Sequence, residues 1–247
     1  MGAAVQASIL SGEMRQILRL DVTPLSLGIE TMGGAVSRLI ARNSTIPAQA
    51  TEHFTTFVDN QTGVDIHVLQ GERELARDCR SLGKFKLGGI PPMPAGLPKI
   101  AVTFTIDANG ILHVAAREER SGQEASIDIQ PSHGLSRDEV ERMIKESVAS
   151  AREDFAARRR IDLRNKAEAN LRHTEKALAR AGGQLTDVER SQIETTRASL
   201  LAAMGAEDLD RLQKSLDEFD AATYPLAEAM VNAAVREKLV HKKASDV

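Results

Sequence analysis

The side chains that could carry out chemistry are few and widely spaced in this chain of 247 residues. Its single cysteine, Cys79, lies close to Arg77 and Arg80, and arginines beside a thiol can lower its pKa. Without a positioned base, however, we interpret Cys79 as an ordinary structural residue. None of the six histidines has a histidine or cysteine at metal-ligand spacing, and His67 and His113 fall on the polar side of alternating segments. The sequence predicts no catalytic residue and no metal site.

A possible phosphate-binding motif is incomplete. Leu82-Gly83-Lys84 matches the end of a phosphate-binding loop, but Asp78 stands where that motif requires its earlier glycine. The dinucleotide-binding pattern G-x-G-x-x-G does not occur. These residues therefore give no support for nucleotide binding.

Composition narrows the class of protein. A net charge of -3 does not favour nucleic acid as a partner. One cysteine excludes an internal disulfide framework and suits a reducing compartment. There is no run of about eighteen apolar residues, so we expect no membrane span. The first residues lack the basic and apolar regions of a secretion signal. We therefore expect a cytoplasmic protein.

The first half of the chain alternates between apolar and polar residues, as strands with one buried face do. Turn residues such as Gly33-Gly34 and Asp107 to Gly110 separate these segments, and four prolines between Gly88 and Pro98 indicate a loop. Short strands at this spacing indicate an antiparallel sandwich or barrel. The alternating apolar sets are Val64, Ile66 and Val68; Val102, Phe104 and Ile106; Leu112, Val114 and Ala116; and Ile127 and Ile129.

After Gly134 the apolar spacing becomes helical. Ser136 with Glu139, and Thr186 with Glu189, have the spacing of capping boxes at helix starts. Gly182-Gly183 and Gly205 are plausible helix ends, and Pro225 suits the first turn of a last helix. The pattern predicts a long helix followed by a small helical bundle. Since the strands precede the helices, we expect two modules in series, with a boundary near residues 131–134.

Several long stretches resemble one family. They are residues 18–34, 43–47, 66–73, 102–104 and 107–112, and the similarity extends over essentially the whole chain. They closely resemble the DnaK-like seventy-kilodalton heat-shock chaperones. This resemblance implies a remnant of the nucleotide-binding domain at residues 1–14 and an interdomain linker at 15–21, with Leu18, Leu20 and Asp21. It further implies a β-sandwich substrate-binding domain at 22–131 and an α-helical lid at 132–247.

The resemblance also implies a peptide-binding groove at one end of the sandwich. Main-chain hydrogen bonds would hold an extended peptide, and one apolar pocket would take a leucine-like side chain. Met32 and Phe57 would arch over the peptide. The plainer alternative is that the pocket residues are simply core, as strand residues of these types usually are. The implied pocket residues are Ile29, Phe54, Val64, Ile66 and Ile100.

The resemblance further implies a latch between the lid and the sandwich. Arg73 would pair with Asp154 near a hinge in the 135–155 region, and Asp59 would pair with Arg172 farther along. Exposed ion pairs contribute only about 0–1 kcal/mol, which suits a latch that must open. Solvated surface charge is the alternative interpretation for each pair.

Three segments are more similar to HscA, the branch of the family that serves iron–sulfur cluster assembly. They are Phe54 to Phe57, Asp78 to Leu82, and Pro94-Ala95-Gly96, and the short C-terminus has the same character. The resemblance thus implies hydrophobic or Pro-containing client segments, an iron–sulfur scaffold protein and, for the full-length protein, a J-domain co-chaperone as partners. A generalist DnaK-like folding chaperone is the alternative. We expect neither nucleic acid nor a membrane as a partner.

The ATPase of the family is not recognised in these residues. We therefore expect that this chain is not an enzyme and has no cofactor, with ATP and magnesium belonging to a missing domain. On that basis a truncated regulatory relative without ATP cycling is a further hypothesis. An enzyme acting through Cys79 is a third, for which no base or oxyanion arrangement is recognisable.

Overall fold

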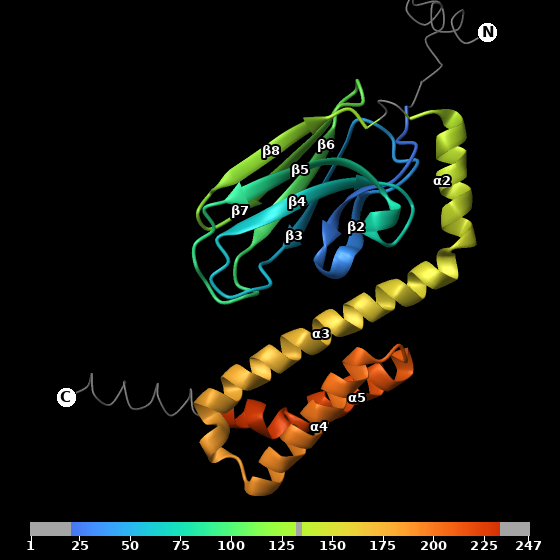
Figure 1. Ribbon diagram of the computed structural model, residues 1–247. Helices are drawn as coiled ribbons and strands as arrows, with labels where there is room; N and C mark the ends of the chain where they lie inside the picture. The colour runs from blue at the N-terminus through green and yellow to red at the C-terminus, as the bar shows by residue number, and fades with distance from the viewer. Residues whose placement is uncertain (1–20, 132–134, 233–247) are drawn as a thin grey trace, which may run out of the picture. The chain divides into compact units, whose positions relative to one another are not determined.

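A computed structural model describes residues 21–131 and 135–232. The chain divides into two compact units, Met1–Ala151 and Arg152–Val247, and each is described by itself (Figure 1). The predicted remnant at residues 1–14 and the linker residues Leu18 and Leu20 lie outside the described residues. The sequence-based boundaries at residues 14, 21 and 131 stay predictions.

Two four-stranded antiparallel sheets make up most of the first unit. One has the strand order β2-β1-β4-β5, and the other has the order β3-β6-β7-β8 (Figure 1). The predicted antiparallel sandwich is thereby confirmed. The strands of the first sheet are β1 (Leu27–Thr31), β2 (Ala35–Ile40), β4 (Gly63–Gln70) and β5 (Arg80–Gly88); those of the second are β3 (Ala48–Phe54), β6 (Ile100–Ile106), β7 (Leu112–Glu118) and β8 (Glu124–Ile129). Two short 3-10 turns lie in connections of the first sheet: η1 (Met32–Gly34) between β1 and β2, and η2 (Ala76–Asp78) between β4 and β5.

The sandwich core follows from the alternation along the strands. In β6, Val102, Phe104 and Ile106 are buried while the residues between them are only partly so. They pack with residues of the other sheet, such as Leu27 and Val68, in one apolar cluster. Burial of each such side chain contributes roughly 1.5–3 kcal/mol. This core holds together the strand ends that form the candidate site.

Helix α2 (Arg137–Ala149) completes the first unit. Ser136 is its N-cap, and the Ser136 hydroxyl accepts a hydrogen bond from the Glu139 N–H at 3.2 Å. The helix ends at Ser150, whose φ and ψ of -94° and 2° are not helical. The predicted long helix is therefore interrupted within the segment where a hinge was expected.

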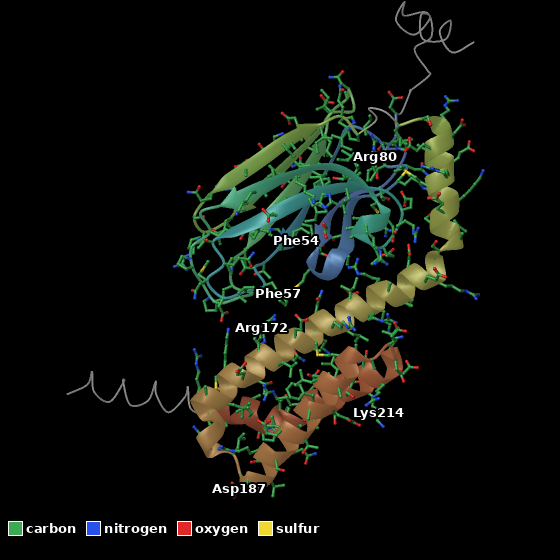
Figure 2. The ribbon with its side chains drawn as sticks, viewed as in Figure 1. Phe54, Phe57, Arg80, Arg172, Asp187 and Lys214 are labelled. Atoms are coloured by element: carbon green, nitrogen blue, oxygen red, sulfur yellow. The ribbon has the colours of Figure 1, made fainter. Side chains whose placement is uncertain are left out.

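The second unit consists of helices around a separate apolar core. They are α3 (Ala151–Ala181), a 3-10 turn η3 (Gly182–Gln184), α4 (Asp187–Gly205), α5 (Leu209–Ala222) and the helical residues 224–232. The predicted helix ends at Gly182 and Gly205 are confirmed, and Thr186 and Glu189 form a complete capping box. Figure 2 shows Asp187 at the start of α4. None of the helices in the described ranges is long and apolar enough to cross a membrane.

Candidate functional site

The strands β1 and β4 separate at one end of the sandwich. Their antiparallel pairing ends at Ile29 and Val68, although β1 continues to Thr31 and β4 begins at Gly63. Beyond this point β1 pairs only with β2, and β4 pairs only with β5. The first sheet therefore forks, and two strand edges face the space between its arms.

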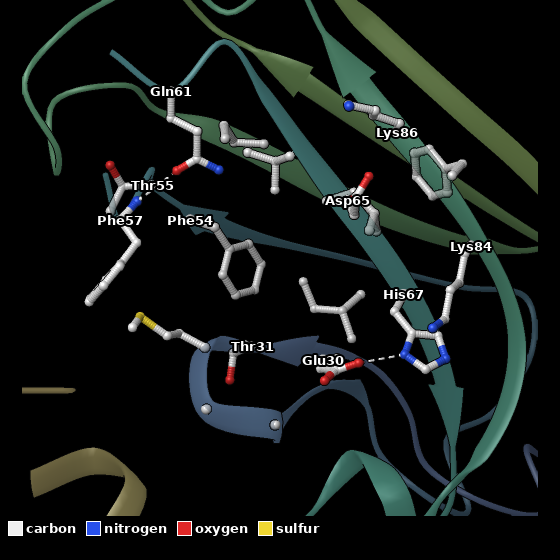
Figure 3. Close-up of a pocket in the computed structure, with 18 residues that line it drawn as sticks. Glu30, Thr31, Phe54, Thr55, Phe57, Gln61, Asp65, His67, Lys84 and Lys86 are labelled. Atoms are coloured by element: carbon white, nitrogen blue, oxygen red, sulfur yellow. Dashed lines mark hydrogen bonds and ion pairs between the residues drawn. The ribbon is translucent and has the colours of Figure 1, made fainter. Parts of the chain in front are cut away.

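A groove of about 820 Å³ lies at this fork (Figure 3). Its lining comes from β1, η1, the end of β3, β4, β5 and the start of β6. All seven residues that the sequence comparison implied for the pocket and its arch line this groove: Ile29, Met32, Phe54, Phe57, Val64, Ile66 and Ile100.

The seven residues differ in exposure in a way that bears on their roles. Ile29, Ile66 and Ile100 are buried and belong to the apolar core of the sandwich as well as to the groove lining. Phe54 and Val64 are partly buried and pack against that core. Figure 3 shows the Phe54 ring directed into the groove. The alternatives of pocket and core are thus not exclusive, because the groove floor is the outer layer of the core.

Met32 lies on the turn that follows β1. This turn is η1, in which Gly33 and Gly34 have φ angles of 82° and 79°. Glycine adopts this left-handed region without the steric cost that a Cβ atom would bring. The Met32 side chain is 37% exposed, as expected for an apolar residue at a groove rim.

Phe57 lies in the loop between β3 and β4, which a small hydrogen-bond network holds. The Gln61 Oε1 atom accepts from the N–H groups of Phe57 and Val58 at 3.2 and 3.3 Å. Its Nε2 donates to the Gly63 carbonyl at 2.9 Å. Figure 3 shows the bond between Phe57 and Gln61. Gln61 therefore closes the loop between β3 and β4 and sets the position of Phe57.

One wall of the groove is charged. His67 on β4 bonds through Nδ1 to Glu30 Oε2 on β1 at 2.6 Å and through Nε2 to Ser81 Oγ on β5 at 2.8 Å. It thus joins three strands where the sheet forks (Figure 3). Sequence reasoning placed His67 only on a polar strand face and missed this role. It also missed further lining residues: Glu30, Thr31, Thr55, Gln61, Asp65, Lys84 and Lys86.

The lysine of the incomplete phosphate motif has a different setting from a phosphate loop. Lys84 lies inside strand β5, where it pairs in register with His67. Leu82 is the extra residue of a bulge between the Val68–Gly83 and Leu69–Ser81 pairs. The segment that resembles a loop motif is therefore strand.

Cys79 shows no sign of an activated thiol. Burial raises its pKa above the ordinary value, although the sequence suggested that nearby arginines could lower it. Its Sγ lies 3.5 Å from the Arg73 carbonyl oxygen. The sulfur contacts the Val36, Leu69 and Ala76 cluster. These contacts agree with a structural cysteine.

The predicted latch residues are distributed over both units. Asp59 accepts a hydrogen bond from the Ala95 N–H at 2.8 Å in the first unit, where Arg73 also lies. Asp154 is in the first turn of α3, and Arg172 is farther along this helix (Figure 2). Since each predicted pair joins one unit to the other, both pairs stay predictions. Asp21, which the sequence assigned to the linker, is exposed at the start of the described residues, and that assignment stays a prediction.

Comparison with known proteins gives two findings. The family model described as "Hsp70 protein" matches residues 1–232. The chaperone protein DnaK of Prochlorococcus marinus (strain MIT 9515) is 46% identical over 230 residues, which cover 93% of this chain. The aligned part is 36% of that relative, so this chain spans about a third of its length.

These matches correct the expectations that the chain is not an enzyme and has no cofactor. The Hsp70 match begins at residue 1, and so includes the segment that resembles the end of the ATPase domain. The expectations that the ATPase is missing and that ATP and magnesium play no part here are therefore wrong. The expectation was wrong because it was drawn from where the given sequence begins. This chain spans only about a third of its relative, so its first residue does not show whether a domain is missing.

The hypothesis of a regulatory relative without ATP cycling was based on those expectations, so it has lost its support. Within the described ranges, no group of three or more His, Cys, Asp or Glu could hold a metal ion. No ATP-dependent step is derived from them. The family model matches residues 1–232, and the DnaK relative aligns with 93% of this chain. This chain therefore belongs to the Hsp70 family of chaperones.

Proposed function

We propose that the groove binds an extended peptide segment and buries one of its aliphatic side chains. The observation that carries this proposal is the fork between β1 and β4, which leaves two strand edges facing a groove. An extended peptide can add to such edges through main-chain hydrogen bonds. Because side chains of a strand alternate between its faces, one peptide side chain would point to the groove floor.

The floor has the chemistry of a pocket for leucine or a similar residue. Ile29, Phe54, Val64, Ile66 and Ile100 supply only hydrocarbon surface. Burial of one aliphatic side chain contributes roughly 1.5–3 kcal/mol, and main-chain bonds distinguish little between sequences. Micromolar affinity, about -8 kcal/mol, is therefore expected, with broad selectivity.

Met32 and Phe57 complete the proposed site. They would close over the bound peptide as an arch, which their places on η1 and on the loop held by Gln61 support. The pairs Arg73–Asp154 and Asp59–Arg172 would latch the helical segment over the groove. Each pair would contribute about 0–1 kcal/mol, so that the latch can open.

Filling the pocket tests the proposal. In Val64→Phe a larger ring would occupy the groove floor, so the affinity for a fluorescein-labelled leucine-rich heptapeptide should fall at least about tenfold, as the loss of one buried aliphatic side chain would produce. Fluorescence anisotropy measures this affinity. The matched control is Val188→Phe, because Val188 is exposed on α4 in the second unit. Equal affinity of Val64→Phe and the control would show that the groove is not the peptide site.

The finer proposal concerns the client. We infer an HscA-like role with a Pro-containing segment of an iron–sulfur scaffold protein, supported by the three similar segments and by the large Phe57 side chain in the groove lining. The generalist DnaK role is the second candidate, favoured by the DnaK relative. A Leu-Pro-Pro peptide and a matched Leu-Ala-Ala peptide distinguish them. Preference for the first supports the specialist role, whereas equal affinity contradicts it.

The remaining proposals concern the whole protein, since this chain spans about a third of its relative. We propose that client binding is coupled to ATP hydrolysis and assisted by a J-domain co-chaperone, in the cytoplasm. Family membership supports these statements. Stimulation of ATP hydrolysis of the full-length protein by a J-domain protein and by the leucine-rich peptide is the measurement that checks them.

A further inference from the structure

The register of β1 and β4 shows which residues stand where the sheet forks. The last pair between these two strands joins Ile29 to Val68. The next position of the same antiparallel register brings Glu30 opposite His67, and there the two described strands form no main-chain pair. The side chains bond instead, with His67 Nδ1 lying 2.6 Å from Glu30 Oε2 (Figure 3). A side-chain bond therefore takes the place of the first missing main-chain pair.

The His67 ring is held from both sides. An ionised carboxylate can only accept a hydrogen bond, so Nδ1 of His67 donates to Glu30. The other ring nitrogen, Nε2, lies 2.8 Å from Ser81 Oγ on β5. Because Leu82 is the extra residue of the bulge in β5, Ser81 lies on the same face of the sheet as Lys84, which pairs with His67. The imidazole is thus fixed in place, and its side chain is only 15% exposed.

The part of β1 beyond this bond leads to the turn that lines the groove. β1 ends at Thr31, which pairs with Ala35 of β2, and η1 lies between these two residues. Met32, the first residue of η1, lines the groove together with the first residues of β4. We call the segment from Thr31 to Met32 the Met32 arm. The bond between Glu30 and His67 links this arm to β4 at the fork.

A bond of the same kind elsewhere in the sandwich has a different setting. On β7, His113 Nδ1 lies 2.6 Å from Asp128 Oδ1 on β8. These two residues are in register, and the strands also pair on both sides of them, at Leu112 and at Val114. Because the main chain already joins β7 to β8 at this point, loss of the His113 bond should not change the separation of the two strands.

We propose that Glu30 and His67 are positioning residues of the groove: their bond sets the distance between the Met32 arm and β4, and so slows the release of a bound peptide. This inference rests on the proposed peptide-binding function. Without the bond the Met32 arm would move away from β4 more readily, and a peptide held between the two would leave faster.

Release of the fluorescein-labelled leucine-rich heptapeptide measures this effect. The full chain is loaded with the labelled peptide, an excess of unlabelled peptide is added, and the decay of anisotropy gives the dissociation rate. In His67→Ala the rate should rise about fivefold, as the loss of one hydrogen bond would produce. In the matched control, His113→Ala, the rate should stay as in the parent. Equal rates in the two variants would overturn the proposal.

Glu30→Ala shows whether the two residues act as one unit. Each single variant removes the same bond, so Glu30→Ala and the double variant with His67→Ala should release the peptide at the same rate as His67→Ala. Two independent structural defects would instead multiply their effects on the rate. Multiplied effects in the double variant would therefore contradict a shared positioning role.

Amide hydrogen exchange of the peptide-free chain tests the link without any peptide. Exchange at Glu30 and Thr31 should be faster in His67→Ala than in the parent, because this end of β1 opens more readily. Exchange at Val114 in the sandwich core should match the parent. Parent-like exchange at Glu30 and Thr31 would show that the bond does not hold the arm, and would overturn the proposal.

Failure of this inference can be told apart from failure of the proposed function. If Val64→Phe binds the peptide as well as its control, the groove is not the peptide site, and both proposals are wrong. If Val64→Phe loses the peptide while His67→Ala releases it at the parent rate, the proposed function holds and the positioning role alone is wrong.

Discussion

At the scale of single residues, Glu118 shows how a buried carboxylate supports the groove. It ends β7 and pairs in register with Ile100, whose side chain lines the groove floor. Its Oε2 accepts hydrogen bonds from the Ser121 N–H at 2.5 Å and the Ser121 hydroxyl at 2.6 Å. Burial favours a higher pKa for Glu118, but these hydrogen bonds outweigh it and hold the pKa below its usual value.

Ser121→Ala tests this arrangement through its pH dependence. Since the pKa of Glu118 is lowered in the folded state, its contribution to the free energy of unfolding is present above the unfolded-state pKa. It is lost as the pH falls through the folded-state pKa. The variant should therefore be less stable than the parent at pH 7, and the difference should shrink in acid.

Urea unfolding at several pH values measures this difference. Ser126→Ala, an exposed serine on β8, is the control and should change little at any pH. A stability difference for Ser121→Ala that stays constant into the acid range would show that the Glu118 carboxylate is not its source.

At the scale of elements, β1 connects the groove to the sheet. Its pairing with β2 shifts register between Leu27 and Gly28. The backbones approach so closely there that a Cβ atom on Gly28 would lie 2.1 Å from the Ser37 carbonyl oxygen. The close approach fixes the path of β1 toward Ile29 and the turn that carries Met32. A glycine at this position is therefore a requirement of strand packing.

Gly28→Ala should destabilise the sandwich by about 1–3 kcal/mol, because the two strands must move apart to admit the methyl group. Thermal or urea unfolding monitored by circular dichroism measures this. Gly88→Ala is the matched control: a Cβ there has no heavy atom within 4 Å, and we expect a small effect. Equal effects of the two substitutions would contradict the close approach at Gly28.

At the scale of the whole molecule, the chain has two separate apolar cores. The sandwich core includes Phe104 and Val68, and the helical core includes Leu200 and Phe219. The two clusters share no residue, and they fall in different compact units. Because cooperativity follows packing, each unit should respond to damage in its own core.

Phe219→Ala should show this independence. Phe219 is fully buried in the helical core, and truncation of such a residue costs about 3–5 kcal/mol. Amide hydrogen exchange should accelerate in α4 and α5 while β4 and β6 keep their protection. Phe104→Ala is the reciprocal variant and should do the opposite. Acceleration throughout the chain in both variants would indicate a single cooperative unit.

Prediction from the sequence was most successful where the signal is local. The alternating apolar residues of β4, β6, β7 and β8 and the turn and cap residues of the helices required no knowledge of distant contacts. The alternation did not predict β3, because the partly buried positions of this strand include Ala48, Ala50 and Glu52 rather than large apolar residues. The alternation did not predict β5 either, because the bulge at Leu82 interrupts the alternating pattern.

The sequence by itself determined the order of strands and helices and, through its motifs, the family and seven residues of the candidate groove. Periodicity and motifs are properties of short segments, so they can be read without a fold. Only the tertiary structure decided that Ile29, Phe54, Val64 and Ile100 meet at a fork between two strands. It also revealed that Gln70 Nε2 is buried with no hydrogen-bond partner among the residues that the structure describes. These features depend on which strands pair, and where their pairing stops, and that is set by the packing of segments far apart in the chain.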